Sequence, residues 1–240
     1  MFDQYPKSRQ ALPEEYARIY VRHYRENRIG GSVASGAAQS LESWLHRQIA
    51  ADLGRARGSA ETLELGAGTL NQLLFEPPCG PYDIVEPFTE LYRDAVELVR
   101  VRNVFSDIRD VPDDFRYDRI ISSAVLEHLC DLPEVVARSC LLLADEGRFL
   151  ASIPSEGTWL WRLGWRMTTG LEFRLRYGLD YGKLMQYEHV NTAREIEEVL
   201  RYFYAEVSMK VFGLSRGISL YQHFACAGPN GGRAREYLNC

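Results

Sequence analysis

The chain has few cysteines, and their spacing carries no signature. Only five occur among 240 residues, and no two of them form a C-x-x-C pair. An odd number without paired spacing argues against a disulfide framework and against a zinc site. No other metal-ligand cluster stands out, so we expect a metal-independent protein. The cysteine usage favours a reducing compartment, and we expect a cytoplasmic location.

Long apolar runs and excess positive charge are also missing. No stretch approaches the roughly 18 apolar residues of a membrane span. Residues 1–10 include Asp, Lys and Arg without an apolar core, unlike a signal peptide. The net charge of −5 gives no reason to expect duplex nucleic acid as a partner. We therefore expect a globular protein that acts on a small molecule, with its oligomeric state open.

The most informative segment is residues 61–68, Glu-Thr-Leu-Glu-Leu-Gly-Ala-Gly. A short apolar run containing Glu64 breaks there into two glycines, Gly66 and Gly68. Glycine permits positive φ and close backbone approach. The pattern is typical of a buried parallel strand whose tip meets a small ligand.

A second run, residues 82–86, also ends in a carboxylate. This acid, Glu86, lies 20 residues after Gly66. In open α/β sheets, ligands bind outside the carboxyl ends of the strands, and an acid at this place commonly holds a ribose diol. The two runs together predict a nucleoside-bearing cofactor.

Repeated strand–helix units predict an α/β fold with a doubly wound, mostly parallel sheet of seven strands. A closing hairpin would add an antiparallel edge. The expected helices include a turn near 69–75 and longer segments at 89–100, 131–143 and 192–203. The expected strands are 62–65, 82–86, 102–106, 119–123, 148–153, 206–212 and 220–227.

Sequence signals mark where several helices begin. Asp131 and Thr192 each have a carboxylate three positions later, which is capping-box spacing. Thr89 is a candidate cap for the helix at 89–100. Two further helices, 13–29 and 37–53, precede the first strand and do not fit the alternation. We interpret them as an N-terminal helical cap, residues 1–58, before a main domain at 59–230 and a tail at 231–240.

Residues 155–188 form an inserted segment that is far longer than an ordinary connection. It holds three of the four tryptophans. The i, i+4 spacing of Trp161 with Trp165 and of Arg162 with Arg166 predicts a helix with an aromatic and a basic face. Three interpretations stay open: a helix packed on the sheet, a lid that binds anionic or sugar groups, and a membrane-surface helix. The lid interpretation names as substrate-binding residues Trp161, Arg162, Arg166, Arg174, Tyr181 and Glu188, with Tyr20 and Tyr24 from the first helix.

Taken together, residues 60–227 resemble a class I S-adenosylmethionine-dependent methyltransferase, which has a Rossmann-like fold. Residues 64–68 resemble its first motif, and Glu86 resembles the acid that binds both ribose hydroxyls. Residues 106–108 resemble the third motif, whose acid accepts from the adenine amino group, and 117–128 resemble the fourth strand and its loop. The resemblance implies S-adenosyl-L-methionine as cofactor. It implies as cofactor-binding residues Glu64, Gly66, Ala67, Gly68, Glu86, Pro87, Asp107, Ile108 and Ser123.

The glycine loop departs from the family pattern at one position. The third glycine of the family falls at Leu70, so we expect a tighter or shifted turn, followed by a short helix. A nicotinamide enzyme shares the fold, but its G-x-G-x-x-G pattern would place Asn71 where the third glycine packs. We therefore favour the methyltransferase over the nicotinamide enzyme.

Two histidines are candidates for acid–base chemistry. An unperturbed imidazole titrates near ~6.5, so His189 can accept a proton from a hydroxyl acceptor at neutral pH. His128 follows the fourth strand on the cofactor side. The alternatives are that His189 caps the helix beginning at Thr192 and that His128 fills a pocket wall.

The acceptor is suggested by a further resemblance. Residues 153–158 and 178–182 look like bacterial methyltransferases of surface-polysaccharide or sugar modification. This implies methyl transfer to an oxygen or nitrogen of a small polar acceptor, such as a sugar or a sugar-linked phosphoryl group. The competing hypothesis is a catalytically silent methyltransferase-like module that binds a protein or membrane through 155–188.

Overall fold

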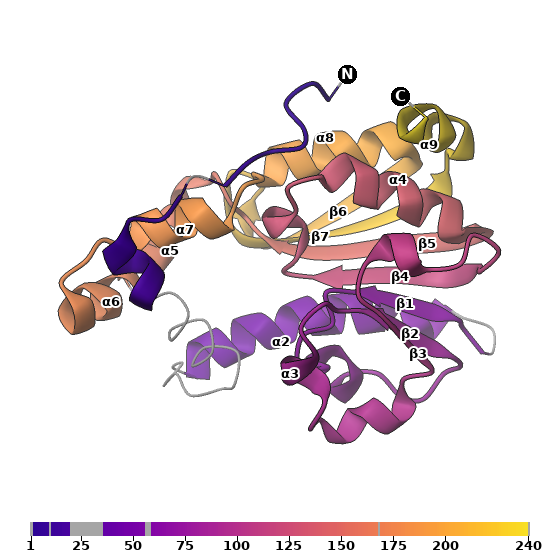
Figure 1. The fold of residues 1–240 in the computed structure, drawn as a ribbon, viewed down its shortest axis with the longest axis horizontal. Coiled ribbons are helices and arrows are strands. Elements are labelled where there is room, and N and C mark those ends of the chain that lie inside the picture. The colour runs from indigo at the N-terminus through magenta and orange to yellow at the C-terminus, as the bar shows by residue number, and fades with distance from the viewer. Residues whose placement is uncertain (1, 10, 20–35, 56–58, 168, 240) are drawn as a thin grey trace.

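One seven-stranded sheet organises the protein (Figure 1). The computed structural model describes residues 2–9, 11–19, 36–55, 59–167 and 169–239, with side chains in the third range from residue 43. The strand order is β3-β2-β1-β4-β5-β7-β6. The first five strands run parallel, whereas β7 is antiparallel to both β5 and β6. The strands are β1 (Thr62–Leu65), β2 (Tyr82–Val85), β3 (Asn103–Phe105), β4 (Tyr117–Ser123), β5 (Leu143–Pro154), β6 (Tyr204–Ser215) and β7 (Ile218–Pro229).

The α/β architecture with an antiparallel edge hairpin is therefore confirmed. The last three strands are longer than expected, and β5 begins directly after the preceding helix. Residues 145–147, which lie between the expected helix at 131–143 and the expected strand at 148–153, are inside β5. The register against β4 shifts there, from Tyr117 opposite Leu143 to Arg119 opposite Arg148. The extra residues of β5 form a bulge that is not paired with β4, and the strand continues on both sides of it.

Helices cover both faces of the sheet (Figure 1). On one face lies α2 (Gly36–Ala50), which contacts β4, β5 and β7. On the other lie α4 (Leu132–Leu142), α8 (Ala193–Phe203) and α9 (Gly231–Leu238). The expected 231–240 tail thus contains a helix. Among the described residues, no helix combines the length and apolarity that a membrane crossing needs.

The predicted helix starts at Asp131 and Thr192 are confirmed. The side chain of Asp131 accepts a hydrogen bond from the backbone N–H of Glu134 at 3.4 Å. Thr192 and Glu195 form a reciprocal capping box. Such boxes satisfy backbone donors that the first turn leaves without partners.

The prediction of one continuous helix over 89–100 is wrong. The chain forms a single turn, α3 (Thr89–Tyr92), and then a separate 3-10 helix at Val96–Arg100. Extended backbone at Ala95 separates them, and Val96 and Val99 are 80% and 90% exposed. Tyr92 is buried, and Ala95 and Leu98 pack against the same core cluster, so the two short helices keep apolar contacts although the backbone breaks between them. Thr89 is the first helical residue, and the cap position falls on Phe88.

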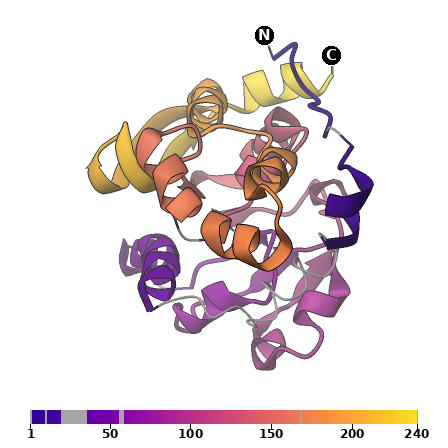
Figure 2. The same ribbon diagram turned by 90° about the vertical axis from the view of Figure 1, so that its left-hand side faces the viewer.

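The insertion forms three helices at one end of the molecule (Figures 1 and 2). They are α5 (Trp159–Met167), α6 (Thr169–Tyr177) and α7 (Tyr181–Glu188). A helical segment at 14–19 packs beside them, and its Tyr16 is buried with Phe173 and Leu184. The Tyr16 hydroxyl accepts a hydrogen bond from the backbone N–H of Asp180 at 3.1 Å. The first helix therefore stabilises the insertion, at least as far as residue 19.

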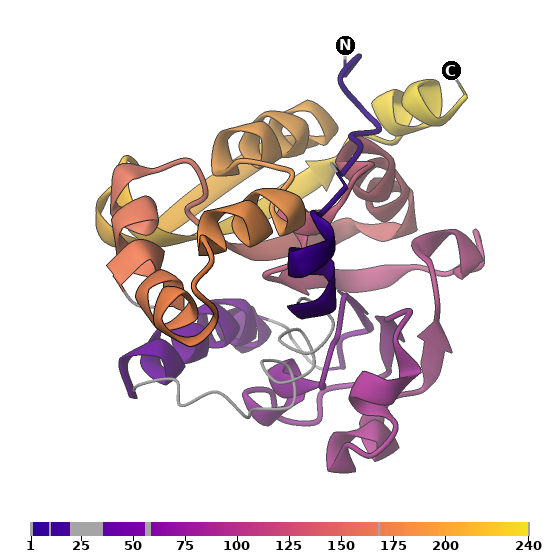
Figure 3. The same ribbon diagram turned by 60° about the vertical axis from the view of Figure 1, so that its left-hand side comes forward.

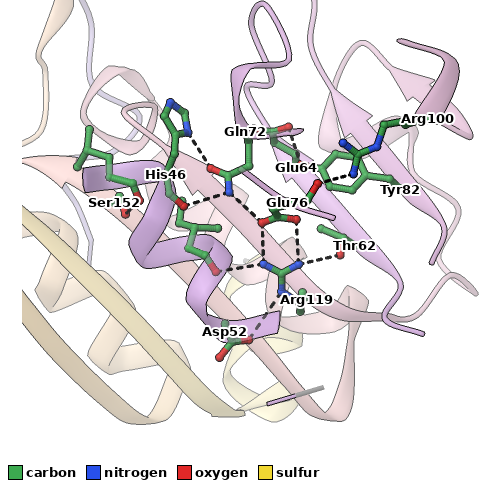
Figure 4. A network of polar contacts seen from close by, with 12 residues as sticks. His46, Asp52, Thr62, Glu64, Gln72, Glu76, Tyr82, Arg100, Arg119 and Ser152 are labelled. Carbon is green, nitrogen blue, oxygen red and sulfur yellow. Dashed lines mark hydrogen bonds and ion pairs between the residues drawn. The ribbon is translucent and has the colours of Figure 1, made fainter. Parts of the chain in front are cut away.

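A buried ionic network fixes α2 and the turn after β1 to the sheet (Figure 4). Its centre is Arg119 on β4, whose guanidinium donates to both carboxylate oxygens of Glu76, at 3.0 and 3.2 Å. Further bonds reach the carbonyl of Ile49 at the end of α2 and the hydroxyl of Thr62 on β1. Gln72 donates to the same Glu76 carboxylate at 2.8 Å. One cation therefore holds three segments together.

Replacing this cation should destabilise the protein strongly. Arg119→Met would leave Glu76 buried without its counter-charge, so we expect the free energy of unfolding to fall by about 3–5 kcal/mol. Urea unfolding followed by circular dichroism measures the change. The control, Arg116→Met, removes an exposed arginine of the same strand region and should alter stability by less than about 0.5 kcal/mol. Equal stability of the two variants would contradict this account of the network.

Candidate active site

The loop after β1 is shaped by two glycines with positive φ. These are Gly66, with φ 67°, and Gly68, with φ 53°. A Cβ atom built on Gly66 would lie 2.4 Å from a methyl group of Val125. The loop after β1 therefore packs directly on the loop after β4, and only glycine fits that contact.

The missing third glycine is accommodated by Leu70. This residue takes the left-handed conformation, with φ 63° and ψ 26°, immediately before a 3-10 helix at Asn71–Leu74. That conformation costs a non-glycine residue roughly 1–2 kcal/mol. The side chain is fully buried in a cluster with Ala67 and Leu73, and this burial offsets the strain. The expected shifted turn and short helix are both present.

Glu86 joins the loops after β1 and β2. One carboxylate oxygen accepts from the backbone N–H of Gly68 at 2.8 Å, and the other accepts from the N–H of Phe88 at 3.0 Å. The residue is 3% exposed. Each carboxylate oxygen can accept a further hydrogen bond, so this group is held in place with acceptor capacity left for a diol.

Asp107 follows β3 and caps the next turn. Both oxygens bind the guanidinium of Arg109, at 2.9 and 2.6 Å, and one also accepts from its backbone N–H. The hydrogen bonds from Arg109 hold the pKa of Asp107 below its usual range, against the effect of partial burial. Its neighbour Ile108 is buried in the main core. The structure thus shows the capping role, and the adenine contact stays a prediction.

Three further cofactor candidates lie at the same strand ends. Ala67 is buried within the glycine loop, Pro87 is exposed beside Glu86, and Ser123 is half-buried at the end of β4. Because β1 to β4 run parallel, these positions share one edge of the sheet.

Glu64 does not open onto this edge. It alternates with the core residues Leu63 and Leu65 along β1, so its side chain points to the opposite, α2-side layer (Figure 4). There its carboxylate accepts from the hydroxyl of Tyr82 at 2.9 Å. Burial raises the pKa of Glu64 to about 8, and the hydrogen bond from Tyr82 only partly counters this.

The two candidate histidines meet although they are 61 positions apart. The backbone N–H groups of Val190 and Asn191 donate to the carbonyl of Glu127, at 2.9 and 3.1 Å. The Asn191 side chain adds bonds to the carbonyls of Leu126 and Leu129, at 2.8 and 2.7 Å. These contacts hold the segment after α7 against the loop after β4.

His189 and Glu156 form a dyad beside His128. Nδ1 of His189 lies 2.9 Å from a carboxylate oxygen of Glu156, which follows the carboxyl end of β5. The His128 ring meets the His189 ring edge to face at 4.8 Å, and its Nδ1 lies 2.9 Å from the carbonyl of Glu188. When each Nδ1 carries the proton, each Nε2 is left as an acceptor.

The charges around His189 decide its protonation. Burial alone would lower the pKa of His189, but the hydrogen bond with Glu156 and the negative charges of Glu127 and Glu188 raise it above its ordinary value. The imidazolium form is therefore stabilised, as a proton acceptor requires.

The same cluster has the residue types of a metal site. Single donor atoms of Glu127, His128 and His189 all lie within 4.8 Å of one another. Sequence spacing did not reveal this group, because two of its members adjoin each other and the third comes from a distant loop. Metal independence stays a prediction.

The residues of the insertion that are expected to bind substrate lie in different surroundings, and their role stays a prediction. Trp161 faces the dyad: its indole N–H donates to Glu156 at 2.5 Å, and its ring lies roughly parallel to that of His189. Arg162 and Arg166 lie on the exposed outer side of α5, and Arg174 is exposed on α6. Glu188 adjoins His128 through its backbone carbonyl. Tyr181 packs on Trp165 and Phe173. Tyr20 and Tyr24 lie outside the described residues.

Two residues of the cluster were missed by sequence reasoning. Glu156 is a carboxylate two positions after a buried strand, a signal close to the one that identified Glu86, and could have been found that way. Tyr221 on β7 forms an edge contact with Trp161 at 5.4 Å. It carries no motif, because an antiparallel partner strand brings it to the site.

Comparison with solved structures identifies the architecture. The plantazolicin methyltransferase BpumL, solved with S-adenosylhomocysteine, superposes over 90% of this chain and 92% of its own, with 14% identity and a TM-score of 0.62. This chain has the fold of a class I S-adenosylmethionine-dependent methyltransferase. No family model and no curated protein sequence matches it.

Two other similar structures are larger proteins. The CurJ carbon methyltransferase matches 82% of this chain at 17% identity and a TM-score of 0.56. Phosphoethanolamine N-methyltransferase 2 of Haemonchus contortus, solved with S-adenosylmethionine, matches 80% at 14% identity and a TM-score of 0.52. The present chain spans 56% and 53% of their lengths. The methyltransferase fold thus occurs in proteins with different acceptors.

The raised pKa of Glu64 predicts a pH-dependent stability. Between the ordinary pKa of 4.5 and about 8, the folded protein keeps a proton that the unfolded chain has lost. Stability from this group is therefore fully present below pH 4.5 and declines as pH rises to about 8. Glu64→Gln keeps an acceptor for Tyr82 but cannot ionise, so it should be more stable than the parent by a few kcal/mol at pH 8.5 and nearly equal at pH 5.

Urea unfolding at the two pH values measures this difference. The control is Glu90→Gln, an exposed glutamate in α3, which should show no such pH dependence. If the advantage of Glu64→Gln were the same at pH 5 and pH 8.5, the carboxyl group would not be protonated in the folded protein.

Proposed function

We propose that the protein transfers a methyl group from S-adenosyl-L-methionine to an oxygen or nitrogen of a small polar acceptor. The observation that carries the proposal is the pairing of two features at one sheet edge. Glu86 is held by the glycine loop with acceptor capacity left, and Glu156 of the His189–Glu156 dyad follows β5 of the same sheet. The first feature suits a nucleoside and the second suits proton removal.

The residues at the strand ends fit the cofactor. Glu86 would bind the ribose hydroxyls, and the backbone of 66–68 would approach the methionine part closely because Gly66 and Gly68 carry no side chain. Asp107 and Ile108 would meet the adenine. When bound, the sulfonium supplies an electrophilic methyl group, so the protein mainly has to position the acceptor and exclude water.

If the acceptor is a hydroxyl, the dyad would remove its proton. Glu156 would hold Nδ1–H of His189, which would leave Nε2 to accept the proton of an acceptor hydroxyl. The carboxylates of Glu156, Glu127 and Glu188 then stabilise the imidazolium. His128 packs against the ring and limits its rotation. A neutral amine would need no base, so the dyad favours oxygen over nitrogen.

Aromatic rings beside the dyad favour a sugar-like acceptor. Trp161 lies next to His189 and Tyr221 packs on Trp161, and aromatic faces pack well against sugar rings. A sugar or sugar-linked phosphoryl group of surface-polysaccharide or specialised metabolism is the acceptor class we propose. The cytoplasmic location and metal independence are part of the same proposal. A catalytically silent module would bind a partner without turnover.

Cofactor binding should depend on the carboxylate of Glu86. Glu86→Gln removes one acceptor oxygen and the negative charge, and charge-assisted bonds contribute about 1.5–3 kcal/mol each. We expect the dissociation constant for S-adenosylmethionine, measured by calorimetric titration, to rise about 10²-fold. Glu90→Gln, nearby and exposed, should bind normally. Binding of NAD in place of S-adenosylmethionine would contradict the proposal.

Turnover of a hydroxyl acceptor should depend on the dyad. An acceptor screen that follows formation of S-adenosylhomocysteine supplies the substrate. His189→Ala should lower turnover about 10²-fold or more while cofactor affinity is unchanged. Activity should rise with pH along a limb whose pKa lies above 6.5, since only neutral His189 accepts a proton.

Glu156→Gln provides the matched test of the dyad. Removing this negative charge destabilises the imidazolium, so the pKa of His189 falls and the activity limb moves to lower pH. Near-normal turnover of His189→Ala would remove this residue from the mechanism, although the cofactor assignment would stand.

A further inference from the structure

The outer side of α5 carries a row of exposed apolar side chains. Trp159, Leu163 and Met167 follow one another at i, i+4 and i+8 spacing, which places them on one helix face. They are 67%, 37% and 67% exposed. The other tryptophans of this helix point inward, Trp161 to Tyr221 and Trp165 to Tyr181. The helix therefore has apolar residues on both sides, although only one side is packed.

The next helix repeats this arrangement. On α6, Leu171 and Leu175 are again four positions apart, and they are 53% and 80% exposed. The opposite side holds Phe173, which is 1% exposed in the small core shared with Tyr16. The helices pack on each other and form the outermost end of the molecule (Figures 2 and 3).

Arginines flank both apolar rows. Arg162 and Arg166 lie on the exposed side of α5, and Arg174 and Arg176 are exposed on α6. The only acidic residue between 159 and 176 is Glu172. This segment is therefore positive in a chain whose net charge is −5. We call its exposed side chains the α5–α6 surface: Trp159, Leu163, Met167, Leu171 and Leu175 with the four arginines.

We propose that the α5–α6 surface docks on an anionic lipid bilayer. Exposed tryptophan, leucine and methionine can enter the boundary between headgroups and acyl chains, while arginines beside them contact lipid phosphates. A protein with a net charge of −5 is on average repelled by an anionic surface, so a local positive patch favours docking through that side. The apolar rows and the arginines both match a membrane, whereas a purely polar ligand would leave the apolar rows in water.

The docking surface adjoins the proposed catalytic dyad. The outer side of α5 would meet lipid, while Trp161 on its inner side contacts Glu156 and His189. One helix thickness, about 10 Å, separates the two. A docked protein would hold its site next to the membrane surface. The docking proposal does not rest on methyl transfer and is tested separately from it.

Flotation with lipid vesicles tests the proposal on the full chain. The probes are vesicles of phosphatidylcholine alone and vesicles with a third of phosphatidylglycerol, at low and high salt. We expect flotation only with the anionic vesicles and less at high salt. Arg162→Gln with Arg166→Gln should weaken partitioning roughly 25-fold, at about fivefold per arginine. The control pair Arg93→Gln with Arg194→Gln removes two exposed arginines elsewhere and should bind as the parent does.

A second pair of variants tests the apolar rows. Trp159→Ser with Met167→Ser should weaken flotation, whereas Val96→Ser with Val99→Ser, which are even more exposed on another part of the chain, should not. Calorimetric titration with S-adenosylmethionine checks that each variant keeps its site, so a failure of docking is separable from a failure of the enzyme.

Three outcomes would overturn the proposal. These are no flotation of the parent protein with anionic vesicles, flotation unaffected by either surface pair, and a parent dimer that Trp159→Ser with Met167→Ser converts to monomer. The last would assign the surface to a second copy of the chain.

Discussion

The site depends on the contact between two loops at the carboxyl edge of the sheet. The backbone N–H of Gly68 donates to Glu86, and Gly66 packs on Val125 without room for a side chain. The first contact joins the ends of β1 and β2, and the second joins those of β1 and β4. Three neighbouring strands are thereby held at fixed spacing where a nucleoside would bind. Any larger residue at Gly66 would push the β4 loop away and separate the cofactor residues from the histidines.

The second half of the site is built by a clamp from the end of the insertion. Asn191 and its neighbours bind the carbonyls of the β4 loop, and this places His189 between Glu156 and His128. The insertion can therefore differ in sequence and still leave the dyad in place, provided that the clamp holds. In this arrangement the inner side of α5 contacts the dyad, whereas its outer side is exposed to solvent and is the side that we propose docks on a membrane.

The sequence predicts the parts of this structure that are local. The strand–loop signals at 61–68 and 82–86 and the caps at Asp131 and Thr192 each depend on a few consecutive residues, and all are present. The helix over 89–100 could not be judged that way. Its residues Tyr92, Ala95 and Leu98 have helical spacing and pack on one core cluster, yet the backbone is extended at Ala95.

Contacts between distant segments could not be predicted from the sequence either. Helical spacing grouped Trp161 with Trp165 and Arg162 with Arg166, but it could not tell which side of α5 faces the protein. The arginines named for substrate, Arg162, Arg166 and Arg174, are all exposed, and their contact with substrate stays a prediction. Likewise, the alternation along β1 that buries Leu63 and Leu65 turns Glu64 away from the edge where the cofactor is expected, toward Tyr82.

A crystal structure with S-adenosylhomocysteine bound tests the central claim most directly. The account predicts that both ribose hydroxyls lie within hydrogen-bond distance of the Glu86 carboxylate and that the sulfur faces His189. A ligand bound away from Glu86, or no binding at concentrations that saturate other methyltransferases, would contradict it.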